Sequence, residues 1–142
     1  MVQRQRAFFE TGRTRDVGFR MRELRRLRQA IARREGDLAN ALRADLGKSP
    51  LDAYTSEIGY VLGDADHALR RMRAWARPRR RRVPPIAWPG RGAVHPMPFG
   101  VALVIGPWNY PFQLLFSPVV SAIAAGNCVC VKPSEYAPHT SR

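Results

Sequence analysis

The sequence has few cysteines, few lysines and no long apolar run. Its two cysteines, Cys128 and Cys130, are one residue apart, a spacing at which a disulfide would be badly strained. They therefore indicate a reducing compartment, and they lack the partner pair that a zinc site would need. No stretch of about 18 apolar residues occurs, so we expect no transmembrane segment. The first residues also lack the apolar core of a signal peptide, which favours a cytoplasmic protein.

Acidic residues are also scarce relative to basic ones. The 142 residues include 24 Lys and Arg against 11 Asp and Glu, a formal net charge of +13, and only Lys48 and Lys132 are lysines. Such an excess attracts polyanions non-specifically, so one hypothesis is a small basic binding module for nucleic acid or an anionic membrane. The same charge is equally compatible with half of a balanced protein whose acidic part lies elsewhere.

Helical periodicity dominates residues 1–77, which we interpret as an N-terminal helical segment. Apolar residues recur every three or four positions from Asp16 to Leu46 and again from Asp52 to Trp75. Gly36 predicts a break inside the first run, and Gly47 is a natural C-cap. The apolar stripes are Val17, Met21, Leu24, Leu27, Ile31, Leu38, Leu42 and Leu46 in the first run, and Ile58, Leu62, Ala65, Leu69, Met72 and Ala76 in the second.

Periodicity is lost in residues 78–100, which are rich in Pro, Gly and Arg. We interpret this stretch as an extended connector with one or two short edge-type strands. Residues 101–142 then predict a strand at Val101–Ile105 buried on both faces, a helix at Phe112–Ala125 and a second strand at Cys128–Val131. Pro118 either kinks that helix or marks its true start. The fold class is therefore α/β, with a βαβ unit that begins a parallel dinucleotide-binding sheet and leaves it incomplete.

Polar residues suited to binding or catalysis follow both predicted strands. Asn109 lies in the turn after the first strand, where it is either a donor for developing negative charge or a simple turn residue. Lys132 and Glu135 follow the second strand, and by themselves they favour a solvated salt-bridging loop. No GxGxxG motif occurs, so a glycine-rich phosphate-binding turn is not visible.

Two segments at this spacing, VIGPWNYPFQLL and AIAAGNCVCVKPSE, closely resemble the aldehyde dehydrogenase superfamily. The upstream FFETGRTR, the helix ending in ALRADLGKS, and Glu57-Ile58-Gly59 with the later Trp75 also match it. The resemblance covers essentially the whole chain and is greatest to the class-3 branch. The sequence is thus similar to the amino-terminal fragment of such an enzyme.

The resemblance implies a role for each matching residue. Asn109 would donate its amide to the oxygen of the thiohemiacetal that forms when a cysteine thiolate attacks a small-molecule aldehyde. The lysine and glutamate of KPSE would contact the adenosine ribose hydroxyls of NAD or NADP. The cofactor-binding set implied in this way is Ile105, Gly106, Pro107, Trp108, Asn109, Lys132, Ser134 and Glu135.

The family's nucleophilic cysteine and general-base glutamate lie downstream of KPSE, and neither segment is present in this sequence. Cys128 and Cys130 lie inside an apolar run, so we interpret them as core residues. We therefore expect a truncated product that is inactive alone, with exposed apolar faces that favour association. The basic run from Arg79 to Arg82 leads, in the family, into oligomer-interface strands, so a homo-oligomer is expected rather than specific nucleic-acid binding.

Overall fold

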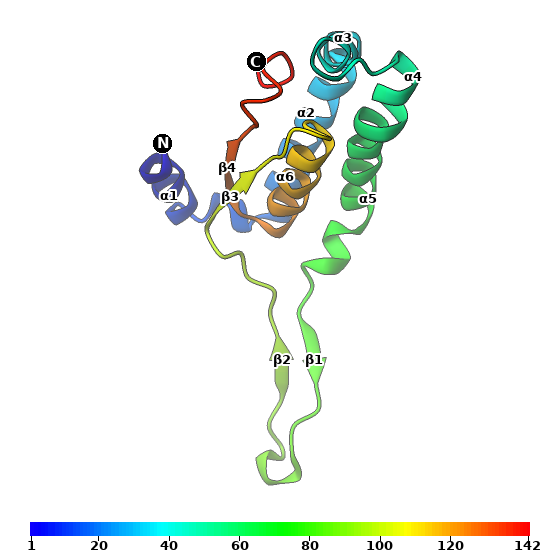
Figure 1. The fold of residues 1–142 in the computed structure, drawn as a ribbon. Coiled ribbons are helices and arrows are strands. Elements are labelled where there is room, and N and C mark those ends of the chain that lie inside the picture. The colour runs from blue at the N-terminus through cyan, green and yellow to red at the C-terminus, as the bar shows by residue number, and fades with distance from the viewer.

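A computed structural model describes all 142 residues of the chain (Figure 1). Its helical part precedes both of its two-stranded sheets. The helical elements are α1 (Val2–Glu10), η1 (Arg13–Arg15), α2 (Val17–Arg33), α3 (Glu35–Leu46), α4 (Pro50–Ala53), the π-helical segment η2 (Tyr54–Ile58) and α5 (Gly59–Trp75). Then follow β1 (Arg79–Arg81), η3 (Pro85–Ala87), β2 (Gly92–Val94), β3 (Val101–Ile105), α6 (Gln113–Ala125) and β4 (Cys128–Lys132).

The predicted helices form, with boundaries set by local capping. The side chain of Asp16 caps α2 by accepting hydrogen bonds from the backbone N–H groups of Gly18 and Phe19, at 3.0 and 2.8 Å. The predicted break lies at Arg34 rather than at Gly36, which is inside α3. Gly47 ends α3 with a φ of 67°, the left-handed conformation that glycine adopts without strain. Helix α1 lies within the segment 1–77 that we interpreted as helical, although the apolar stripes begin only at Val17.

The connector forms the short edge strands that its composition predicts. Strands β1 and β2 pair antiparallel, with Arg79 opposite Val94 and Arg81 opposite Gly92. The hairpin extends away from the helices, as Figure 1 shows, and the three arginines of β1 are exposed. The fold thus separates an arginine-rich arm from the part of the chain that contains the predicted site.

The last third of the chain forms the predicted βαβ unit. Strands β3 and β4 pair in parallel, from Val101 opposite Cys128 to Ile105 opposite Lys132. The strands lie between α1 and α6 (Figure 1), and both helices contact them. Helix α6 begins before Pro118, which lies inside it, so the alternative that Pro118 marks the helix start is wrong.

The expectation that β3 is buried on both faces is also wrong. The side chains of Leu103 and Ile105 are 64% and 65% exposed. A short apolar run predicts a strand, but its burial depends on which other elements cover the sheet. In this chain only α1 and α6 have extensive contacts with β3 besides its partner strand β4.

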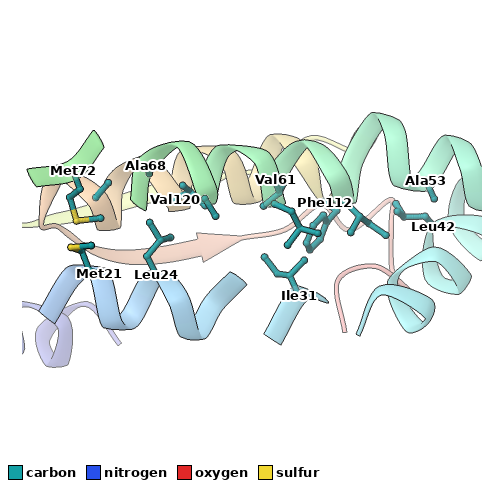
Figure 2. Close-up of a cluster of buried hydrophobic side chains, with 14 residues drawn as sticks. Met21, Leu24, Ile31, Leu42, Ala53, Val61, Ala68, Met72, Phe112 and Val120 are labelled. Carbon is teal, nitrogen blue, oxygen red and sulfur yellow. The ribbon is translucent and has the colours of Figure 1, made fainter. Parts of the chain in front are cut away.

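The hydrophobic core lies between α2, α5 and α6 and extends to α3 and α4 (Figure 2). Leu24, Leu42 and Ile58 are completely buried in it. Phe112, which immediately precedes α6, is 3% exposed and belongs to the same cluster. Because α6 starts inside this core, the turn between β3 and α6 is attached at one end to the sheet and at the other to the helices.

No helix in the structure is both long enough and apolar enough to span a membrane.

Candidate functional site

The two predicted polar segments leave neighbouring strands at the same edge of the sheet. Ile105, the last residue of β3, pairs with Lys132, the last residue of β4. The backbone N–H of Gly106 donates to the carbonyl oxygen of Lys132 at 3.0 Å. The structure therefore confirms that the turn after β3 and the loop after β4 begin side by side, as the carboxyl ends of parallel strands do.

Asn109 lies in the turn between β3 and α6 with its side chain exposed. That side chain makes no hydrogen bond within the chain, so it does not cap or close the turn. Its amide is free to donate to another molecule. Pro107 and Trp108 are also exposed, whereas Gly106 is buried against Leu115, where a Cβ would lie 3.0 Å from the Leu115 side chain.

Lys132 and Glu135 form an ion pair on the surface of the loop after β4. Their side chains are 54% and 68% exposed. The hydrogen bond from the Lys132 ammonium, followed by smaller backbone and charge contributions, holds the pKa of Glu135 below its ordinary value. A hydrogen-bond donor and an acceptor therefore stand together at the strand ends.

Ser134 lies between these residues but is oriented differently. It is buried, and its hydroxyl oxygen accepts a hydrogen bond from the backbone N–H of Tyr136 at 3.2 Å. Its carbonyl oxygen accepts from the hydroxyl of Ser141 at 2.9 Å. The structure therefore places the Ser134 side chain inside the loop and not beside the exposed Lys132–Glu135 pair.

Asn109 and the Lys132–Glu135 pair do not line a common cavity among the principal hollows of the surface. The largest of these, about 560 Å³, lies between α5 and α6 and contains none of the three residues. Their strands adjoin, but the crevice that we expect them to share stays a prediction.

Two charged residues next to the turn, the buried Glu57 and the partly buried Lys48, were not identified from the sequence as site residues. Glu57 is completely buried, and its carboxylate accepts hydrogen bonds from the backbone N–H groups of Phe112 and Gln113, at 2.8 and 3.2 Å. The Lys48 ammonium lies 2.5 Å from the other carboxylate oxygen and 4.2 Å from the centre of the Tyr110 ring. Both residues therefore support the turn that carries Asn109.

A sequence signal for Glu57 did exist. The stripe expected for the second helix includes Leu69 and Ala76, which are only partly buried. The face that is most deeply buried consists instead of Val61, Ala65, Ala68 and Met72. Glu57 precedes Val61 by four residues on this face, so a correctly centred stripe would have placed a carboxylate in the core.

The two cysteines pack in the interior, as predicted. Both are 7% exposed, and burial, together with the neighbouring Cys130, raises the pKa of the Cys128 thiol. A buried thiol with a raised pKa is a poor nucleophile. No group of three or more His, Cys, Asp or Glu side chains is arranged to hold a metal ion.

The exposed donor and acceptor at the strand ends fit the ribose end of a nicotinamide dinucleotide. Paired ribose hydroxyls each donate and accept hydrogen bonds, so an ammonium beside a carboxylate matches them chemically. The residues present are therefore compatible with this class of cofactor.

Comparison with known proteins gives a consistent result. A family model described as "Aldehyde dehydrogenase family" matches residues 1–142. The 4,4'-diaponeurosporen-aldehyde dehydrogenase of Staphylococcus aureus is 40% identical over 137 residues, which are 96% of this chain and 30% of that protein. The dimeric NADP-preferring aldehyde dehydrogenase of Canis lupus familiaris is 44% identical over 135 residues, which are 95% of this chain and 30% of that protein.

Solved structures agree with this result. The substrate-bound Staphylococcus aureus AldH superposes with a TM-score of 0.95 at 40% identity, covering 97% of this chain and 30% of that one. The chain thus spans about 30% of the length of the relatives that it matches. These matches do not favour the alternative of a small basic binding module.

Proposed function

Because this chain belongs to the aldehyde dehydrogenase family, we propose that it forms the amino-terminal portion of an NAD(P)-dependent enzyme that oxidises an aldehyde to a carboxylic acid. The family uses a nicotinamide dinucleotide, which supplies the hydride acceptor when bound. The observation that carries the proposal is the pairing of Ile105 with Lys132, because it brings the Asn109 turn and the Lys132–Glu135 loop to one edge of the sheet.

Lys132 and Glu135 hold the adenosine ribose in this proposal. The Lys132 ammonium donates to a ribose hydroxyl, and the Glu135 carboxylate accepts from one. Their mutual ion pair holds the two groups adjacent before the ligand arrives. Ser134 acts indirectly, through the loop conformation that its buried hydroxyl stabilises.

Ile105, Gly106, Pro107 and Trp108 line the nicotinamide side of the same cleft, and Asn109 follows them. The exposed Asn109 amide donates to the aldehyde oxygen as negative charge develops on it. A donor already in place for that charge stabilises the transition state by about 3–4 kcal/mol.

The chain by itself should not oxidise aldehydes. Its only cysteines are buried in the core, and the pKa of Cys128 is raised rather than lowered. We expect no formation of reduced nicotinamide when the purified chain is mixed with an aldehyde and NAD+ or NADP+. Sustained turnover under these conditions would show that the chain is active alone and that this expectation is wrong.

Titration calorimetry with NAD+ tests the cofactor site, and substitution of Glu135 makes the test decisive. The net charge of +13 attracts any anionic nucleotide to the surface. If attraction of this kind were the only source of binding, Glu135→Gln would strengthen binding by removing a negative charge. If Glu135 accepts from the ribose, the same substitution weakens binding.

A matched pair of charge substitutions completes the experiment. Lys132→Met should weaken NAD+ binding about tenfold, the effect of losing a hydrogen bond from a charged donor. Arg79→Met removes the same charge from the exposed hairpin and should leave binding within about twofold at about 150 mM salt, where the Debye length is about 8 Å. Equal losses in the two variants, or tighter binding by Glu135→Gln, would contradict the proposal.

Two further properties extend to this chain only as proposals. A relative is described as dimeric, and we propose that the β1–β2 hairpin takes part in assembly between copies of the complete enzyme. The cofactor is NAD or NADP. A carboxylate beside the ribose disfavours a 2′-phosphate by charge repulsion, so Glu135→Gln should shift the preference toward NADP+.

A further inference from the structure

The carboxylate of Glu57 is buried at the start of α6, far along the sequence from the residues that it contacts. Its side chain has no exposure to solvent. One carboxylate oxygen accepts hydrogen bonds from the backbone N–H groups of Phe112 and Gln113. The other pairs with the ammonium of Lys48, whose side chain is only 10% exposed. Every polar atom of the carboxylate is therefore engaged.

This arrangement replaces the cap that α6 lacks. Phe112, at the N-cap position, has no side chain that could accept from the first N–H groups of the helix. Glu57 supplies that acceptor from η2, and its negative charge also lies at the positive end of the helix dipole. The start of α6 is thus fixed by the N-terminal helical segment.

Lys48 extends the same contact to the turn itself. Its ammonium lies over the ring of Tyr110, the residue that follows Asn109, and 3.3 Å from the hydroxyl of Ser56. Tyr110 is thus held by a cation, and Phe112 by the carboxylate paired with that cation. The two contacts lie one and three residues after Asn109.

The backbone of the turn makes few other hydrogen bonds. At its beginning, the N–H of Gly106 is bound to Lys132 at the strand end. Between this contact and Phe112, the only backbone hydrogen bond that involves the turn is from the N–H of Leu114 to the carbonyl of Tyr110. The orientation of residues 107–111 therefore depends on the strand end at one side and, at the other, on the burial of Pro111 and Phe112 and on the Lys48–Glu57 pair.

We infer that the Lys48–Glu57 pair is a positioning device that orients the turn at residues 107–111 and, with it, the donor amide of Asn109. This inference rests on the proposed function. Neither residue touches substrate or cofactor; both act through the backbone and ring of the turn. The pair also connects the turn to η2, through Glu57, and to the loop between α3 and α4, through Lys48.

The test compares three variants: Glu57→Gln, Lys48→Met and the double variant. Glu57→Gln keeps the shape of the side chain but sets an amide opposite the ammonium, and Lys48→Met removes the cation. The double variant has no charge left unpaired at this position, and the oxygen of its glutamine side chain can still accept from the start of α6. Asp66→Asn, which removes a carboxylate of α5 that pairs with Arg28 of α2, is the control for an altered charge elsewhere.

Two readouts separate positioning from a general loss of structure. Hydrogen exchange at the Phe112 and Gln113 amides reports the contact directly and needs no ligand. Affinities for NAD+ and for AMP report the site, because AMP contains only the adenosine half that Lys132 and Glu135 would hold. A displaced turn alters the nicotinamide half alone.

We expect both single variants to accelerate exchange at these two amides and to weaken NAD+ binding about tenfold while AMP binding changes less than about twofold. The double variant should lose no more than the worse single variant, since the residues act as one unit. Asp66→Asn should change neither readout.

Unchanged exchange in Glu57→Gln, or equal losses for NAD+ and AMP, would overturn the inference. Failure of the unsubstituted chain to bind either nucleotide would instead overturn the proposed function, and the exchange data would still decide the role of the pair.

Discussion

Gly126 lies directly against the guanidinium of Arg20. A Cβ at residue 126 would fall 2.6 Å from the Arg20 Cζ atom, and the backbone of Gly126 has a φ of 92°. The guanidinium cannot easily move away, because it donates to the carbonyls of Thr14, Arg15 and Ala124 at distances from 2.5 to 3.3 Å. This contact fixes the junction between α6 and β4 against the start of α2.

We therefore expect Gly126→Ala to lower the free energy of unfolding by at least about 2 kcal/mol, the sum of left-handed backbone strain and a displaced buried arginine. Urea unfolding of the variant and of the unsubstituted chain measures this change in free energy. Gly12→Ala is the matched control, since Gly12 also has a positive φ, 74°, but nothing lies within 4 Å of its Cβ position. Equal losses in the two variants would show that the Arg20 contact contributes nothing.

For Asn109 we expect almost no effect of substitution on stability, because its side chain is exposed and makes no hydrogen bond within the chain. Asn109→Ala should change the free energy of unfolding by less than about 0.5 kcal/mol, as for a surface residue without a structural role. If Asn109 stabilised the turn, the substitution would instead lower the free energy of unfolding by about 1 kcal/mol, as removal of a helix cap does. The same unfolding measurement, with Asp16→Ala as a cap-removing control, distinguishes the two.

Acid should destabilise the fold through carboxylates that are held charged by hydrogen bonds. Burial opposes the charged form of Asp45, but hydrogen bonds from Thr140 and His139 outweigh it and leave its pKa below the ordinary value. A folded-state pKa below the unfolded one stabilises the protein above the unfolded pKa of about 3.9 and loses this effect as the pH falls through the folded value.

The corresponding experiment compares Asp45→Asn with the unsubstituted chain across the acidic range. The variant should be less stable at about pH 7, and the gap should close as the pH falls below about 4. Asp16 and Asp66, whose pKa values are also lowered, keep their contributions in both proteins. A gap independent of pH would contradict the role assigned to Asp45.

The Lys132–Glu135 pair makes a prediction that does not depend on any ligand. The hydrogen bond from Lys132 is the main reason that the pKa of Glu135 is lowered. Lys132→Met should therefore raise the pKa of Glu135 toward its ordinary value. Carboxyl-carbon NMR titration measures this change, and Arg79→Met should leave it unaltered. An unchanged pKa in Lys132→Met would mean that the pair is not formed in solution.

Local patterns in the sequence were sufficient to predict most elements of this fold. The apolar stripe from Val17 to Ile31 and the cap at Gly47 follow from helical periodicity and backbone sterics, and both are confirmed. The parallel pairing of β3 and β4 follows from a strand–helix–strand order within about thirty residues. In each case the determining interactions lie close together in the chain.

The features that were missed depend on contacts between distant residues. The burial of Glu57 results from its pairing with Lys48 and with the start of α6, 55 residues later. Leu103 is exposed because, apart from its partner strand β4, only α1 and α6 contact β3 extensively. Periodicity identifies which residues share a face, but it does not identify which partner satisfies a buried charge or covers a strand.

The most direct test of the proposed cofactor site is an NMR titration of the chain with NAD+ that follows backbone amides. Binding at the strand ends predicts saturable shifts confined to two segments, Ile105–Asn109 and Lys132–Glu135. These shifts should persist at about 150 mM salt, where a purely phosphate-driven attraction weakens steeply. Shifts spread over the arginines of α2 and the β1–β2 hairpin, and lost on adding salt, would contradict it.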